Sequence, residues 1–438
     1  MRVCSVIALA SLLTVPAWAG EGESADWGDA ADWGAAADWG DASVEAPKVH
    51  EVRIYGFIDS YWEYVAAAPE GVSKDGQTEK GGAGHEFDVA NLNVMIQGSV
   101  HSRYRYFVNL AAPGAGGVTG DEPISIRNAW VEAPIKGRYL QVRAGKTYRR
   151  FGLYNEQLDA VPTFIGIEPP ELFDKDHLMV TRTTNLMLHG SVPVKSATVH
   201  YSVATGNDER SGSAVPIGAD LYVDVNGTLK VGSSFYTSGG AAGPSRAVGE
   251  GSPRGGVANW MAEDRYQVFG GYAQLTAGST TVQTEFWHAP HDAVRDEASV
   301  AQLADAGLNA RQLERFFVDG DPSKGVGPLA VQYAVQTAYV RAGHQVAMGK
   351  QGSITPYIQA DWYHNPELVE AKSYGGDGEA GMADDGTFFK YTAGTVIRPF
   401  PEVALKLDGS VHQLTYNGAT EFYPEVRVSF SYLWQLDI

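Results

Sequence analysis

The chain ends on the stretch VRVSFSYLWQLDI, residues 426–438, in which apolar side chains alternate with mostly polar ones. Successive side chains of a strand point to opposite faces. One face of this strand therefore carries Val426, Val428, Phe430, Tyr432, Trp434, Leu436 and Ile438. A strand with lipid on one side and water on the other requires this pattern, whereas a soluble edge strand with so many exposed aromatic rings would aggregate. The stretch predicts that the chain closes a membrane barrel.

The N-terminal residues predict export. A mainly apolar run over residues 6–15 is followed by Ala17 and Ala19, which match the small residues of a signal-peptide cleavage site. No stretch reaches the roughly 20 apolar residues that a spanning helix needs. The single cysteine, Cys4, precedes the cleavage site, so the mature chain has no thiol for a disulfide, a metal or a haem attachment motif. We expect residues 1–19 to be removed and the protein to reach the outer membrane of a Gram-negative cell.

A low-complexity tract, residues 20–50, precedes the alternating segments. It contains the unit ADWG three times with a period of six, which matches the burial pattern of neither a helix nor a strand. We expect a disordered tract in the periplasm. Its repeated side chains Trp27, Trp33 and Trp39 either bind a periplasmic partner by avidity or belong to a passive spacer.

The composition narrows the class of protein. The formal net charge is -19, with no basic stripe, which argues against a nucleic-acid-binding protein. Mean hydropathy is slightly negative at -0.20, although the chain contains 22 Tyr and 51 Gly. In a membrane barrel the lipid-facing and water-facing positions cancel in such a mean, so the composition suits that class.

Sixteen alternating segments are expected as strands within residues 51–438. They lie near residues 52–65, 86–100, 103–112, 124–135, 138–147, 183–193, 196–205, 218–225, 228–237, 265–276, 279–289, 329–342, 353–364, 387–398, 402–414 and 422–437. Connections after even-numbered segments are tight, as at Asn226-Gly227, a strong hairpin signal, with a longer exception around residues 345–352. Connections after odd-numbered segments are long and rich in Gly, Asp and Glu. Short periplasmic turns and long outer loops predict an all-β fold, an antiparallel transmembrane barrel of about 16 strands.

The parity of the strands predicts which side chains face the lumen. In the second segment Leu92 and Val94 alternate with Asn91 and Asn93, and the polar set belongs inside. Eight strands would fill their interior with side chains, whereas sixteen leave a water-filled channel. Passage of solutes is the function that this width predicts.

The connection over residues 148–181 should narrow the channel. It carries too many aromatic and aliphatic side chains to remain in water, so we expect it to fold inward against the wall. At this point the chain resembles the Gram-negative outer-membrane porins, in particular the phosphate-selective porin O and P-like group. The resemblance rests on YGFIDSY (55–61), RNAWVE (127–132) and VRAGK (142–146), which leads to RFG (150–152). It implies a barrel of sixteen strands, often a homotrimer, with the third loop inside, and passive diffusion of ions and small hydrophilic solutes.

The residues themselves predict the charges of the constriction. On the wall, parity points four basic side chains into the lumen, and they are Arg53, Arg143, Lys406 and Arg427. The loop supplies Arg149 and Arg150 and six carboxylates, and these are Glu156, Asp159, Glu168, Glu171, Asp174 and Asp176. A basic wall facing an acidic loop sets a transverse field and predicts a weakly selective or mildly cation-preferring pore. The alternative is that Arg149, Arg150 and Arg182 only neutralise the loop carboxylates.

Other functions are less well supported by the sequence. The histidines show no metal-ligand spacing, so we expect no metal and no cofactor. No Ser/His/Asn or Asp/His grouping predicts an enzyme. Residues 298–317 read as one short amphipathic helix, a packed lid on the outer rim. The alternative to a porin is a structural or adhesin barrel with a plugged lumen, or a sleeve around a partner cytochrome.

Overall fold

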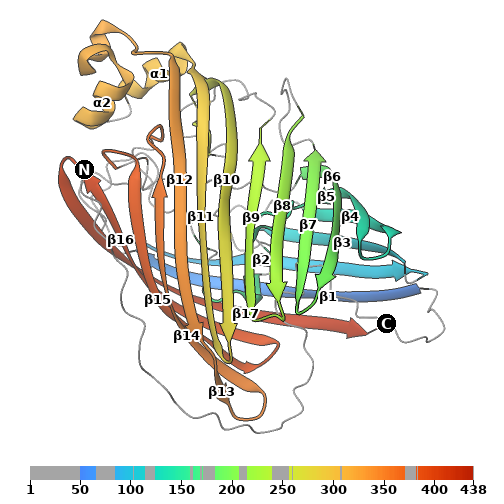
Figure 1. Ribbon diagram of the computed structural model, residues 1–438. Coiled ribbons are helices and arrows are strands. Elements are labelled where there is room, and N and C mark those ends of the chain that lie inside the picture. The colour runs from blue at the N-terminus through green and yellow to red at the C-terminus, as the bar shows by residue number, and fades with distance from the viewer. Residues whose placement is uncertain are drawn as a thin grey trace.

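The protein folds as a large antiparallel sheet that closes on itself (Figure 1). The computed structural model describes residues 50–65, 84–101, 103–113, 124–157, 161–167, 170, 183–206, 215–238, 256–258, 260–305, 308–369, 381 and 383–437. Residues 1–19, most of the tract over residues 20–50, and much of the outer connections lie outside this part of the chain. Within it, no helix is both long enough and apolar enough to cross a membrane.

Seventeen strand segments form the sheet. They are β1 (His50–Val65), β2 (Gly84–Val100), β3 (Tyr104–Pro113), β4 (Ser125–Lys136), β5 (Leu140–Thr147), β6 (Thr183–Val194), β7 (Ala197–Gly206), β8 (Ile217–Val225), β9 (Leu229–Thr237), β10 (Met261–Ala277), β11 (Thr280–Arg295), β12 (Ala330–His344), β13 (Val346–Met348), β14 (Gly352–His364), β15 (Thr387–Phe400), β16 (Val403–Tyr416) and β17 (Ala419–Asp437). Each expected strand has a counterpart among them, with shifted ends.

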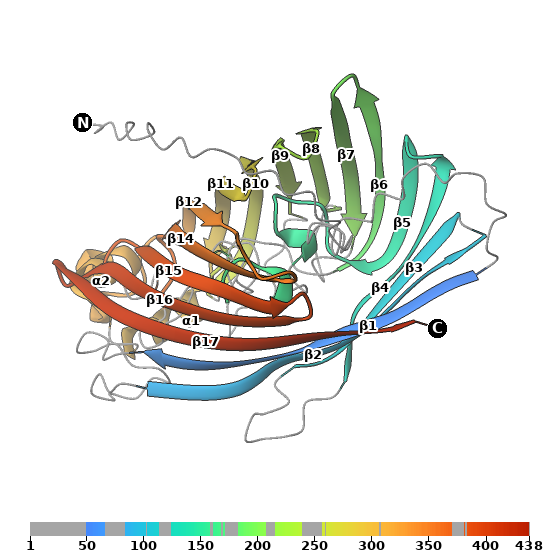
Figure 2. The ribbon, with the colours of Figure 1, turned by 90° about the horizontal axis from the view of Figure 1, so that it is seen from below.

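The seventeen segments occupy sixteen positions in the barrel. Gly343 of β12 lies opposite Tyr357 of β14, and Val346 of β13 lies opposite Ile354, so β12 and β13 share one register and form one broken strand. Every segment pairs antiparallel with its neighbours, and β17 pairs with β1. The expected closed barrel of sixteen strands is confirmed, and Figure 2 shows its wall from below.

Tight turns join the strands on one rim, which we call the periplasmic rim. The positive φ angles of Asn226 (51°) and Gly227 (69°) suit the hairpin predicted there. Two expectations about connections are wrong. β13 extends the wall to Met348, so only three residues separate it from β14. On the opposite rim β16 and β17 are joined by the two residues Asn417 and Gly418, because both adopt the left-handed conformation that a tight hairpin requires.

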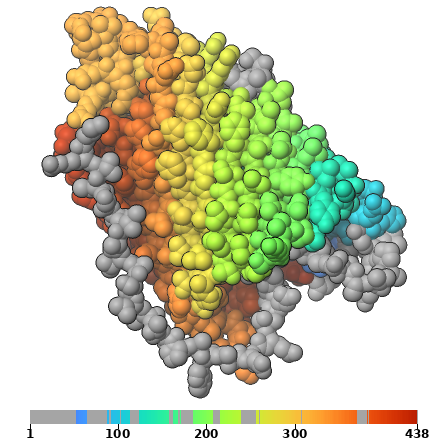
Figure 3. Space-filling model, viewed as in Figure 1, coloured from blue at the N-terminus to red at the C-terminus, as the bar shows by residue number. Residues whose placement is uncertain are grey.

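The two faces of the wall differ in chemistry. On the outer face large apolar side chains are exposed, as at Leu221 (56%) and Ile358 (64%), and β7 to β12 form a continuous outer surface (Figure 3). On the inner face polar side chains such as Asn93 and Ser431 are buried. In β17 the apolar set from Val426 to Leu436 is largely exposed, as the sequence predicted. A band of apolar side chains facing outward is what a lipid environment stabilises.

Short helices cover one side of the outer rim (Figure 1). The single helix expected over residues 298–317 is wrong, because two separate caps start two helices. Asp296 caps α1 (Glu297–Gln302), and Asn309 with Gln312 forms a capping box on α2 (Ala310–Phe316). The 3-10 turns η7 (Leu303–Asp305), η8 (Val318–Gly320) and η9 (Pro322–Lys324) complete this cover.

The cover is held to the barrel by Arg295, whose guanidinium donates to the Arg315 carbonyl of α2 at 3.2 Å and pairs with Glu367 in the connection after β14, and by an aromatic contact. Arg295 at the end of β11 donates two hydrogen bonds to Glu367, of 2.9 and 2.7 Å. Phe316 of α2 packs edge-on against Trp260, with ring centroids 5.8 Å apart. The rim helices are therefore a packed part of the wall.

Candidate functional site

The third loop folds into the barrel, as the sequence predicted. Its first arm contains η3 (Asn155–Gln157). The Leu153 backbone N–H donates to Glu285 of β11 at 3.1 Å, and the Gly152 N–H donates to Ser234 of β9 at 3.0 Å. A Cβ on Gly152 would lie 2.1 Å from a Glu285 oxygen, and the backbone there has φ +62°. Only glycine permits this approach.

The second arm of the loop reaches the other side of the lumen. It comprises residues 161–167 and contains η4 (Val161–Thr163). The Ile167 N–H donates to Asp408 at 2.8 Å, and the Lys406 ammonium donates to the Gly166 carbonyl at 2.8 Å, both from β16. Arg398 of β15 donates to the Pro162 carbonyl. We call residues 151–157 and 161–167 the strap, because they run from β9 and β11 to β15 and β16 inside the wall (Figure 2).

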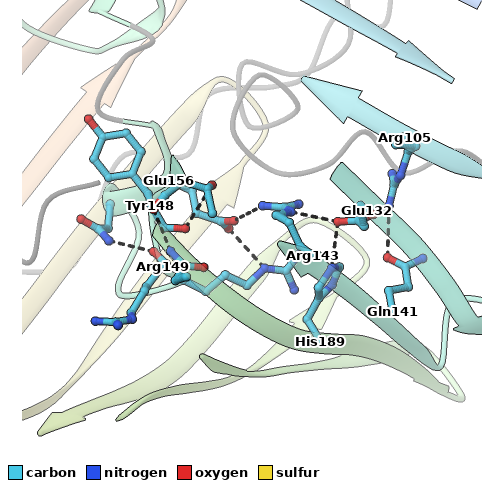
Figure 4. Close-up of polar contacts among 12 residues, drawn as sticks. Arg105, Glu132, Gln141, Arg143, Tyr148, Arg149, Glu156 and His189 are labelled. Carbon is cyan, nitrogen blue, oxygen red and sulfur yellow. Dashed lines mark hydrogen bonds and ion pairs between the residues drawn. The ribbon is translucent and has the colours of Figure 1, made fainter. Parts of the chain in front are cut away.

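A charged cluster lies on β3 to β6 beside the strap (Figure 4). Glu132 of β4 accepts hydrogen bonds from Arg105 of β3 and from Arg143 of β5, the latter at 2.9 Å, and contacts His189 of β6 at 2.8 Å. The strap enters through Glu156, which pairs with Arg143 at 3.2 Å. A continuous chain of charge pairs thus links the wall to the loop.

Within the loop, Glu156 also pairs with Arg150 at 3.3 Å. Burial disfavours the charge of Arg150, but Glu156 and the nearby Asp220 outweigh it, so its pKa is raised above the ordinary value. Burial raises the pKa of the Tyr154 hydroxyl. Arg150 is therefore charged and held at a fixed position in the loop.

The cluster keeps partial contact with solvent, unlike the far side. The side chains of Arg105, Arg150 and Glu156 are 18%, 11% and 17% exposed. On the opposite side an apolar cluster extends from Phe151 and Tyr154 of the strap to Trp260 and Phe316 at the outer rim. The partly exposed charges of the cluster therefore lie on β3 to β6, whereas the other side combines apolar packing with buried charged groups such as Glu285.

Only some of the predicted site residues come together. Arg143, Arg150 and Glu156 come together in the cluster, and Lys406 contacts the strap through a carbonyl. Arg149 is buried, with its guanidinium 5.1 Å from the centre of the Tyr236 ring. Asp159, Glu168, Glu171, Asp174 and Asp176 lie outside the described residues.

Two predicted wall cations lie elsewhere. Arg427 pairs with the wall carboxylates Glu63, at 3.3 Å, and Glu425. Arg53 is exposed on the inner face of β1 near the periplasmic rim.

Sequence reasoning missed several residues of the constriction. Arg105, Glu132 and His189 complete the charged cluster, and Glu285 and Asp408 anchor the strap. All five lie within strands that the sequence predicts, on positions whose parity places them inside. The alternation within each strand could therefore have shown that these side chains point inward, but it could not have shown which residues they contact.

The comparisons with known proteins concern the fold alone. No protein-family model matches the chain, and no curated protein is similar to it in sequence. The anion-selective porin from Comamonas acidovorans superposes with a TM-score of 0.55 and 12% identity, covering 88% of this chain and 100% of that one. OmpF of Salmonella typhi, in complex with daunomycin, superposes with a TM-score of 0.51 and 11% identity, covering 88% of this chain and 98% of that one. OmpT of Vibrio cholerae in its trimer form superposes with a TM-score of 0.50 and 13% identity, covering 88% of this chain and 100% of that one. The chain has the barrel fold of these outer-membrane proteins.

Proposed function

We propose that the protein is an outer-membrane porin, a channel for passive diffusion of ions and small hydrophilic solutes. The observation that carries this proposal is the strap, which crosses a barrel of sixteen strands and leaves charged groups in partial contact with solvent on β3 to β6. A wall of this size encloses more space than side chains fill. We place the passage beside this charged cluster, where the side chains of Arg105, Arg150 and Glu156 remain partly exposed.

The charges of the constriction predict weak selectivity. In the cluster three guanidinium groups, of Arg105, Arg143 and Arg150, face the two carboxylates Glu132 and Glu156. We expect the loop carboxylates outside the described residues to oppose this small positive excess. We expect a weakly selective or mildly cation-preferring pore, and reversing Glu168 and Glu171 to Lys should move the reversal potential toward anions. An unchanged reversal potential would count against this role of the loop.

The size limit of the passage can be measured by liposome swelling. Proteoliposomes with the refolded mature protein should swell in small sugars and progressively less as the sugar grows, because the strap narrows the lumen. Equal swelling with and without protein would contradict the proposal. A Gln variant of Glu314, exposed on α2, is a control that should swell like the wild type.

A second candidate is a barrel with a plugged lumen. It is favoured by the apolar cluster, which joins the strap to the rim helices through fully buried residues such as Trp287 and Val335. A sleeve around a cytochrome or a structural barrel would have such a filled interior. This reading predicts a folded barrel that admits no sugar.

The finer assignments belong to the same proposal. We propose the porin O and P-like group as the related family, a homotrimer as the assembly, and the outer membrane as the location, after removal of residues 1–19. The repeats around Trp27, Trp33 and Trp39 are a candidate site for a periplasmic partner.

A further inference from the structure

Four cations lie on three neighbouring turns of the periplasmic rim. Arg103 follows β2, Lys136 ends β4, Arg138 lies between β4 and β5, and Lys195 follows β6. All four side chains are exposed, and no carboxylate partner for them occurs in the described part of the chain. We call these four residues the basic arc.

Aromatic rings accompany the basic arc. Tyr104 and Tyr139 are 49% and 44% exposed, each next to an arginine of the arc. The Arg138 guanidinium lies 5.7 Å from the centre of the Tyr139 ring. Asp224, near the end of β8, and Glu402, in the turn after β15, are acidic but lie outside this part of the rim. The arc thus offers positive charge and ring faces together, in a chain whose net charge is -19.

The sequence before β1 has the complementary chemistry. Residues 20–49 contain eight carboxylates and one lysine, Lys48, and three of the carboxylates directly precede a tryptophan. This segment enters the barrel at His50, and β1 pairs with β2, whose turn carries Arg103. The C-terminal end of the acidic segment is therefore attached to the barrel beside the basic arc.

The segment is long enough to reach every residue of the arc. Thirty residues can span at most about 100 Å. Sixteen strands spaced about 4.8 Å apart and tilted by about 40° enclose a barrel about 30 Å across. Tethering at such a distance gives an effective concentration on the order of millimolar, so weak charge pairs suffice for occupancy.

We propose that residues 20–49 dock on the basic arc of their own barrel. The aspartates pair with Arg103, Lys136, Arg138 and Lys195, and the adjacent tryptophan rings cover Tyr104 and Tyr139. Exposed charge pairs are screened by salt, so the docked state is favoured at low ionic strength and lost at high ionic strength. This inference is independent of whether the lumen conducts.

A carbodiimide, which joins carboxylates to lysine amines without a spacer, tests the docking in the full mature protein. At low salt we expect amide links within one chain from Asp26, Asp32 or Asp38 to Lys136 and Lys195, identified by mass spectrometry. Lys350, on a distant periplasmic turn, serves as the internal control and should link several-fold less. If the links to Lys136 and Lys195 are absent, or if links to Lys350 are equally frequent, the proposal is overturned. Anionic lipid headgroups would then be the ligands expected at the arc. Links found only between an isotope-labelled and an unlabelled chain would overturn docking on the same barrel.

A charge-removal variant separates docking from chance proximity. Arg103→Gln with Arg138→Gln leaves both reporter lysines in place and should lower the yield of links several-fold. Arg311→Gln, an exposed change on α2 at the opposite rim, should leave the yield unchanged. Equal yields in the two variants would contradict a role for the arc.

Discussion

At the scale of single residues, Glu156 is the group that joins the loop to the wall. It pairs with Arg143 and Arg150 at 3.2 and 3.3 Å, so its removal leaves two guanidinium groups with less compensation. One charge about 10 Å from a permeating ion in water changes its energy by roughly 0.4 kcal/mol, which corresponds to a factor of about two. Removing the charge disfavours a cation and favours an anion by about this factor each, so we expect Glu156→Gln to lower the ratio of cation to anion permeability about fourfold, read from reversal potentials in a salt gradient. Glu314→Gln is the control, and a shift of equal size there would contradict the assignment.

Gly152 tests whether the first arm of the strap is held by contact. A Cβ there would meet Glu285, whereas a Cβ on Gly137, at a similar φ of +52°, would meet nothing within 4 Å. Both changes to Ala carry backbone strain of about 1–3 kcal/mol. Only Gly152→Ala should also displace the arm. On a gel, the heat-modifiable band of the folded barrel disappears as urea unfolds it. We expect the urea concentration at the midpoint of this loss to be lower for Gly152→Ala than for Gly137→Ala. Equal midpoints would mean that the contact with Glu285 contributes nothing.

The residue scale also marks the limit of what the sequence predicts. Alternation in β2 and β17 indicates which side chains face inward, because strand geometry has a fixed period of two. The contact between Leu153 and Glu285 joins residues 132 positions apart, and no local pattern encodes it. The charged cluster was therefore predicted in part, through Arg143, Arg150 and Glu156, while Glu132 and Arg105 were missed.

At the scale of elements, the outer rim is held by the pair Arg295–Glu367. Both side chains are nearly buried, and breaking a buried pair by removing one partner typically costs about 3–5 kcal/mol. Glu367→Gln should therefore loosen α1 and α2 and speed tryptic cleavage after Arg311 and Lys324. The matched control is Asp319→Asn, which breaks an exposed pair with Lys324 worth about 0–1 kcal/mol. Cleavage at the same rate in both variants would show that the pair does not fix the helices.

Element boundaries were predicted less well than element order. The turn before β14 was expected to be long, around residues 345–352, yet β13 continues the register of β12 into that range. The helix expected over residues 298–317 is divided because Asn309 starts a new one. In the first case the pairing with β14 decides the outcome, whereas in the second the capping box of Asn309 and Gln312 is a local signal that the apolar pattern does not contain.

At the scale of the whole molecule, the even number of strand positions and the pairing of β17 with β1 follow from one requirement. In a bilayer no strand edge can remain without hydrogen-bond partners, so an antiparallel sheet has to close. The alternating chain end at residues 426–438 predicted this closure, and the register of β1 with β17 confirms it. The state of the lumen depends on the strap and the rim helices, whose packing the strand pattern does not contain.

Single-channel conductance of the refolded mature protein in a planar bilayer, with a salt gradient, tests the central claim most directly. We predict stable conductance steps, in groups of three for a trimer, with a reversal potential close to zero or slightly on the cation side. A folded barrel that inserts into the bilayer and shows no conductance steps would contradict the proposed porin function and establish a plugged lumen.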